Sequence, residues 1–157
     1  MERGVGTILV ATDLSPITAT LFSTAAHVGC RDGVITAFHV YTPDDYIEVR
    51  RETGMPVDQY IANLKAELRF QLEQAGLPPM TVRLEVVEGR SVPEQILAAA
   101  DRLNAGLIIM GTHGRTGLRR ALMGSVAEEV LRRSRRPVLV VPQAVLGAVP
   151  AGERVTA

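Results

Sequence analysis

The chain has 157 residues, of which 46% are hydrophobic and 22% charged, a composition that excludes a disordered chain and indicates one folded domain. Its 17 lysines and arginines balance its 17 aspartates and glutamates, so no overall field attracts nucleic acid or an anionic membrane. The single cysteine, Cys30, excludes an internal disulfide and favours a reducing compartment. The apolar run 8–11 is too short for a signal peptide or a membrane span, so we expect a cytoplasmic protein without a membrane partner.

Short β-rich runs alternate with segments of helical period along the chain. Several runs are apolar almost throughout, which is typical of parallel strands covered on both faces. Apolar residues spaced by three and four predict helices through residues 61–72 and 96–103. This alternation predicts an α/β fold. The predicted strands are 6–11, 34–40, 81–88, 106–110 and 137–141.

Capping chemistry marks three helix starts. Ser15 is followed by proline and predicts an N-cap, and the stretches that begin at Ser91 and Ser125 match the capping box. By contrast, residues 41–58 are polar, contain two prolines and are predicted to form a surface loop. Residues 143–157 lack helical period and are expected to be a C-terminal tail after a domain of residues 1–142.

The stretch from Gly111 to Ser125 contains four glycines between a predicted strand and a predicted helix. In an open parallel sheet, ligands bind beyond the carboxyl ends of strands, which places this loop and residues 11–15 at the same crevice. The following helix directs its free N–H groups there, as an anion site requires. Glycine at 111, 114 and 124 would permit left-handed angles and close approach of a ligand. A plain surface loop with glycine turns is the alternative.

The glycine spacing, with two residues between Gly111 and Gly114 and nine before Gly124, resembles the nucleotide-binding signature of the universal stress protein family. The stretches Ile8–Asp13 (ILVATD), Phe38–Val40 (FHV) and Arg136–Pro142 (RPVLVVP) resemble the first, second and last strands of that family. The resemblance covers about residues 5–142. It implies that the bound cofactor is ATP, and magnesium could arrive on its phosphates.

The resemblance also implies where each part of the nucleotide would lie. The adenine would lie between the first and second strands, the ribose and first phosphate at the end of the fourth strand, and the outer phosphates at the following helix. The small side chain at position 11, where many relatives have proline, leaves room for the adenine. In that order, the implied binding residues are Ala11, Asp13 and Val40; Met110, Gly111 and Gly114; and Gly124, Ser125 and Val126.

Some of these residues allow other interpretations. Asp13 could instead cap its own turn. A receiver domain needs an aspartate after the third strand and a late lysine, whereas Glu88 stands there and Lys65 is the only lysine. His113 has no identifiable orienting carboxylate, and the histidine spacings do not suit a metal site. The seven arginines between 115 and 136 lack the interleaved aromatic residues of a nucleic-acid surface.

We therefore expect a doubly wound, Rossmann-like α/β domain, similar to the adenine nucleotide alpha hydrolases, with strand order 3-2-1-4-5. It would bind ATP as a nucleotide-dependent regulator in the stress response. No catalytic base or Walker lysine is identifiable, so ATP hydrolysis would be slow or absent. The apolar last strand favours a homodimer, as the resemblance also implies. The alternative function is a dimeric protein-interaction module of the same fold that binds no nucleotide.

Overall fold

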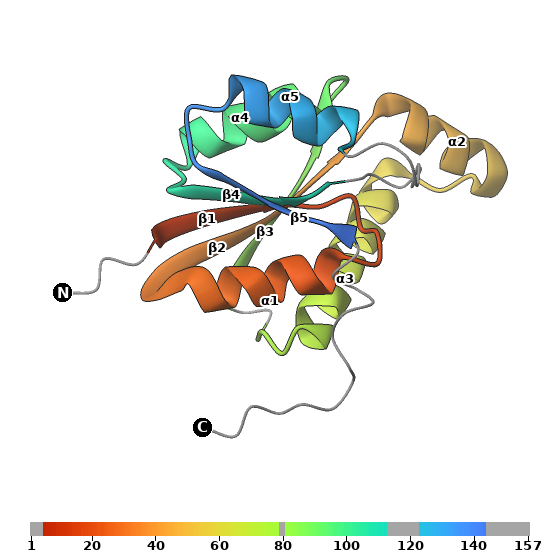
Figure 1. Ribbon diagram of the computed structural model, residues 1–157. Helices are drawn as coiled ribbons and strands as arrows, with labels where there is room; N and C mark the ends of the chain where they lie inside the picture. The colour runs from red at the N-terminus through yellow and green to blue at the C-terminus, as the bar shows by residue number, and fades with distance from the viewer. Residues whose placement is uncertain (1–4, 79–80, 113–122, 144–157) are drawn as a thin grey trace.

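The computed structural model describes residues 5–78, 81–112 and 123–143. A five-stranded parallel sheet forms its centre, with the strands in the order β3-β2-β1-β4-β5 (Figure 1). The predicted doubly wound α/β fold and strand order are therefore confirmed. The strands are β1 (Val5–Ala11), β2 (Gly29–Tyr41), β3 (Val82–Glu88), β4 (Leu107–Gly111) and β5 (Val138–Val141).

Helices cover both faces of the sheet. α1 (Thr18–Val28) and α3 (Val57–Gln74) lie on one face, and α4 (Val92–Arg102) and α5 (Ser125–Arg133) lie on the other (Figure 1). Along β1, Ile8 and Val10 pack towards α1 and α3, whereas Leu9 and Ala11 pack towards α4 and α5. Burial of both faces explains why several strands are apolar almost throughout. Within the described part of the chain, no helix has the length and apolarity of a membrane span.

The strand boundaries agree with the prediction to within one residue for every strand except β2. β2 begins at Gly29 rather than at residue 34, and its pairing with β1 is irregular, because Val5 pairs with Gly29 and Thr7 with Val34. The early part of β2, residues 29–33, reads GCRDG and has no apolar alternation. Pairing with β1 extends the strand where the local sequence has no strand pattern.

Residues 41–58 do not form the predicted surface loop, because most of them belong to α2 (Pro43–Thr53). Thr42 and Asp45 form a reciprocal capping box at its start, and Gly54, with φ of 69°, ends it in the left-handed conformation. No residue of α2 is buried, so the helix leaves no apolar period in the sequence. The signal that could have revealed it is the Thr-Pro-Asp-Asp start.

The structure corrects the predicted N-cap at Ser15 and the predicted capping box at Ser91. α1 begins at Thr18 rather than next to Ser15, and Ile17 is its N-cap. Ser15 lies instead in the turn after β1, where its carbonyl accepts the Thr18 amide at 3.0 Å. Ser91 is the N-cap of α4 as predicted, but its side chain makes no capping hydrogen bond.

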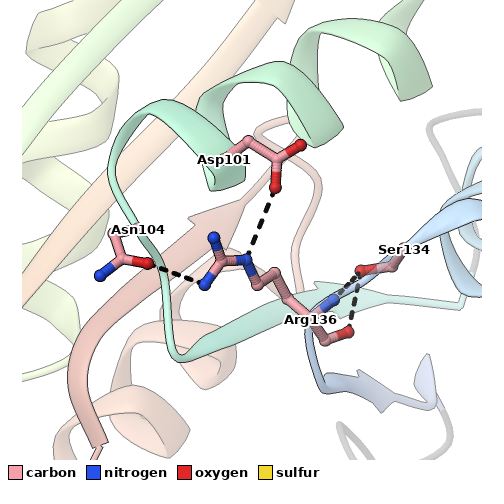
Figure 2. Close-up of polar contacts among 4 residues, drawn as sticks. All are labelled: Asp101, Asn104, Ser134 and Arg136. Carbon is pink, nitrogen blue, oxygen red and sulfur yellow. Dashed lines mark hydrogen bonds and ion pairs between the residues drawn. The ribbon is translucent and has the colours of Figure 1, made fainter.

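A polar contact group joins α4 to the turn before β5, at the amino ends of β4 and β5 (Figure 2). Arg136 Nη1 donates to Asn104 Oδ1 at 2.9 Å, and Arg136 Nε lies 3.5 Å from Asp101 Oδ1. Ser134 Oγ donates to the Arg136 carbonyl at 2.8 Å and accepts from the Arg136 amide at 3.0 Å. These contacts hold the segment that leads into β5. They lie at the amino ends of the strands, opposite the carboxyl edge of the sheet.

We expect the buried core to determine stability far more than this surface group. Leu68 of α3 is fully buried, so Leu68→Ala should lower the free energy of unfolding by about 2–5 kcal/mol. The Asp101 side chain is 61% exposed, so Arg136→Ala should cost less than about 1 kcal/mol. Urea unfolding of both variants measures the two losses, and equal losses would contradict this ranking.

Candidate functional site

A crevice opens at the carboxyl edge of the sheet, where β1 and β4 end side by side. The last pair in their ladder is Ala11 with Met110. Beyond it, the Thr12 amide donates to the Phe38 carbonyl in β2 at 3.0 Å, whereas the Thr112 amide donates to a carbonyl of β5 at 3.2 Å. The segments that follow β1 and β4 therefore turn away from each other. This is the change in connection direction at which open α/β sheets bind ligands.

A cavity of about 300 Å³ occupies this crevice. Residues from the ends of β1, β2 and β4, and from the beginnings of α1, α2, α4 and α5, line it. Eight of the nine binding residues inferred from the sequence are among them, and the ninth, Gly114, lies outside the described residues together with His113, Arg115, Arg119 and Arg120. The eight are Ala11, Asp13, Val40, Met110, Gly111, Gly124, Ser125 and Val126.

The N-terminus of α5 forms one wall of the cavity. Gly124 is the N-cap, and its amide donates to the Thr112 carbonyl at 2.5 Å. Ser125, Val126 and Ala127 follow as the first three helical residues, and all three line the cavity. Their amides have no carbonyl partner within their own helix, and the positive end of the helix dipole lies behind them. Ser125 is therefore not the predicted capping residue, and its hydroxyl does not cap the helix.

The backbone angles correct the reason inferred for two of the glycines. Gly111 is the last residue of β4, and Gly124 has an extended backbone with φ of −72° and ψ of 157°. Neither adopts the predicted left-handed conformation. Because glycine has no Cβ, both residues leave the main chain accessible from the cavity that they line. Within the described ranges, positive φ angles occur at Leu14, Gly54, Gly76 and Asn104.

A directed chain of hydrogen bonds holds the turn after β1, in which Leu14 has φ of 64°. The Leu14 amide donates to Thr12 Oγ1 at 3.0 Å, and Thr18 Oγ1 donates to the Ser15 carbonyl at 2.7 Å. Because a hydroxyl has one proton, the 2.7 Å contact between the two threonine hydroxyls runs from Thr12 to Thr18. All donors in the chain point the same way, so the bonds strengthen one another.

Asp13 combines a turn role with a place on the cavity wall. Its Oδ1 accepts the Ser15 amide at 3.0 Å, which confirms the alternative interpretation of Asp13 as an Asx-turn residue. The same residue lines the cavity. The turn therefore fixes the orientation of a carboxylate that a ligand would meet.

Sequence reasoning missed four polar residues that line the cavity: Thr12, His39, Asp45 and Thr112. His39 is buried, and its Nδ1 lies 2.8 Å from the Thr12 carbonyl oxygen. Since a carbonyl only accepts, His39 Nδ1 carries a proton and donates it to Thr12. Asp45 could not be assigned to the site, because residues 41–58, which contain its helix, were predicted to form a loop. His39 could have been found, because it directly precedes Val40, one of the inferred binding residues.

The two polar walls of the cavity differ in charge. Asp45 comes from α2, which follows β2, and the free amides come from α5, which follows β4. β2 and β4 flank β1 on opposite sides. Apolar residues, among them Phe38 and Ile96, line the space as well. The described residues contain no group of three or more His, Cys, Asp or Glu side chains that could hold a metal ion.

The sequence of the chain that forms this crevice matches a known protein family. The model of the universal stress protein family matches residues 4–142. This chain is a member of that family. Universal stress protein MJ0577 of Methanocaldococcus jannaschii is 34% identical over 95 residues, which cover 60% of this chain and 56% of the relative. Universal stress protein Rv2005c of Mycobacterium tuberculosis is 31% identical over 137 residues, which cover 87% of this chain and 45% of the relative.

Solved structures of similar proteins have the same fold as this universal stress protein. The structure of MJ0577 has a TM-score of 0.69 at 28% identity, covering 87% of this chain and 95% of that one. A universal stress protein solved in complex with cAMP has a TM-score of 0.64 at 22% identity, covering 89% and 98% of the two chains. The chain matches only about half of the length, or less, of the first curated relatives.

We expect His39 to stabilise the turn after β1 through the Thr12 carbonyl. His39→Leu leaves this buried carbonyl without its donor and should lower the free energy of unfolding by about 1–3 kcal/mol. His39→Asn offers an amide donor near the position of Nδ1 and should recover part of the loss. Urea unfolding of both variants measures this difference, and equal losses would contradict the role of the hydrogen bond.

Proposed function

We propose that this universal stress protein binds ATP in the cavity between the ends of β1 and β4. The observation that carries the proposal is the wall formed by Ser125, Val126 and Ala127, whose helix N-terminus suits an anion. Apolar side chains of the same cavity suit the flat faces of a purine. A nucleotide combines both chemistries in one molecule. The cAMP complex of a family member supports this ligand class.

The proposed arrangement places the adenine beside Asp13, Val40 and the backbone near Ala11. The ribose and first phosphate then lie along the end of β4, at Met110 and Gly111, and extend towards Gly114. The outer phosphates lie beside Gly124 and reach the amides of Ser125 and Val126, which have the positive end of α5 behind them. Magnesium would arrive with the nucleotide, coordinated mainly by phosphates and water.

We infer that the bound nucleotide acts as a regulatory signal in the stress response and is hydrolysed slowly or not at all. Phosphoryl transfer needs a group that orients the attacking nucleophile and a cation such as the Walker lysine. The sequence has no identifiable catalytic base and no Walker motif. The place of this regulation would be the cytoplasm.

A dimer through β5 is the second part of the proposal. β5 is an edge strand, and Val138, Leu139 and Val140 are only half-buried in the single chain. An apolar edge offers unpaired backbone groups to a second copy. This edge also supports the alternative function, an interaction module without nucleotide, and ATP binding distinguishes the two.

The first test is replacement of Gly124 by valine. Its branched side chain would lie between the ligand and the α5 amides, so the affinity for ATP should fall by about tenfold or more, equivalent to 1.4 kcal/mol or more. Titration calorimetry of the protein stripped of carried-over small molecules measures this affinity. Gly6→Val is the matched control, because a Cβ at Gly6 meets nothing within 4 Å. ATP affinity unaffected by Gly124→Val would reject the site.

The dimer is tested by Val140→Lys. A lysine in the middle of β5 places a charge on the proposed interface, so the variant dimer should dissociate at a higher protein concentration than the wild-type dimer. Sedimentation velocity over a concentration series measures the dissociation. An unchanged dimer would place the interface elsewhere, and a monomeric wild type would reject dimerisation itself.

A further inference from the structure

We propose that Asp45 selects the nucleoside half of the ligand, by accepting a hydrogen bond from a ribose hydroxyl or from the base amine. This inference rests on the proposed nucleotide site and adds a residue outside the glycine signature. Asp45 is the residue through which α2 reaches the cavity. Its neighbour Asp44, in the same helical turn, does not line the cavity and is exposed.

The capping box holds the Asp45 carboxylate in one orientation. Asp45 Oδ2 accepts the Thr42 amide at 2.7 Å and the Thr42 hydroxyl at 2.8 Å. The Thr42 hydroxyl in turn accepts the Asp45 amide at 3.2 Å. A carboxylate held by this many bonds loses little further freedom when a ligand donor meets it, and such preorganisation favours specific recognition.

Packing against α3 holds α2 in place. The Tyr46 ring of α2 lies 5.4 Å from the Tyr60 ring of α3, and the Tyr46 hydroxyl donates to the Met55 carbonyl at 3.1 Å. Tyr60 also packs edge-on against Tyr41 at the end of β2, with the ring centres 5.3 Å apart. Figure 1 shows α2 beside the upper end of α3, beyond the carboxyl edge of the sheet. The first turn of α2 is thus fixed relative to the strand that ends at the cavity.

Charge decides which half of a nucleotide Asp45 meets. A carboxylate repels phosphates, which carry negative charge and have no donor to offer it at neutral pH. The α5 amides attract phosphates and come from the strand on the other side of β1. A nucleotide with its phosphates at α5 therefore turns its nucleoside towards α2. The donors there are the ribose hydroxyls and the exocyclic amine of the base, and an ionised acceptor makes the stronger hydrogen bonds.

The test compares Asp45→Asn with Asp44→Asn, which removes the same charge from the same turn. Calorimetry of the stripped full chain is run with ATP, 2′-deoxyATP, 3′-deoxyATP and purine riboside triphosphate, which lacks the base amine. We expect Asp45→Asn to weaken ATP binding about tenfold and Asp44→Asn to change it less than about twofold. The loss caused by Asp45→Asn should shrink for the analogue that lacks the donor. A deoxy analogue then identifies the ribose, and the purine riboside identifies the amine.

Two outcomes would overturn the inference. The first is equal ATP affinity in Asp45→Asn and Asp44→Asn, and the second is the same loss from Asp45→Asn with all the ligands. ATP binding by the wild type in either of these cases keeps the proposed function. A wild type that does not bind ATP rejects the proposed function as well.

Discussion

The site depends on one feature of the sheet, the divergence of β1 and β4 after their last shared pair, Ala11 and Met110. Backbone amides must keep hydrogen bonds when buried, and Thr12 and Thr112 keep theirs by pairing with strands on opposite sides. The space between them cannot be closed by the sheet itself. The ends of β1, β2 and β4 line the cavity, with the loops and helix starts that follow these strands and the start of α4, which follows β3.

The turn after β1 and the start of α5 organise this space in different ways. The turn uses side chains, with Thr12, Asp13, Thr18 and His39 making hydrogen bonds that hold Leu14 at a positive φ. The helix start uses main chain, because its first amides have no partner within the helix. One part is built to be rigid, and the other has hydrogen-bonding capacity that a ligand can use. The first therefore shapes the site, and the second supplies the attraction for an anion.

The carboxylates give the cavity a direction. Asp13 and Asp45 face it from the β1 turn and from α2, whereas the positive helix end comes from the β4 side. A ligand with anionic and donor-bearing ends has a preferred orientation in such a field. A ligand that is anionic throughout would meet a carboxylate at one end, which is why the proposed occupant is a nucleotide rather than a plain phosphate compound.

The sequence by itself determined the strand alternation and the doubly wound fold, because strands buried on both faces leave local apolar patterns. Eight residues that meet at the cavity were implied by the resemblance of the glycine spacing and strand motifs to a known family. The sequence did not determine α2, in which no residue is fully buried and no apolar period appears, or the early start of β2, which pairing with β1 imposes. Only the tertiary structure decided that His39 bonds the Thr12 carbonyl and that Asp45 reaches the cavity. It also decided that Gly111 and Gly124 have no left-handed angles. These features depend on contacts between segments far apart in the chain and on backbone angles set by neighbours, and neither is encoded in a local run of residues.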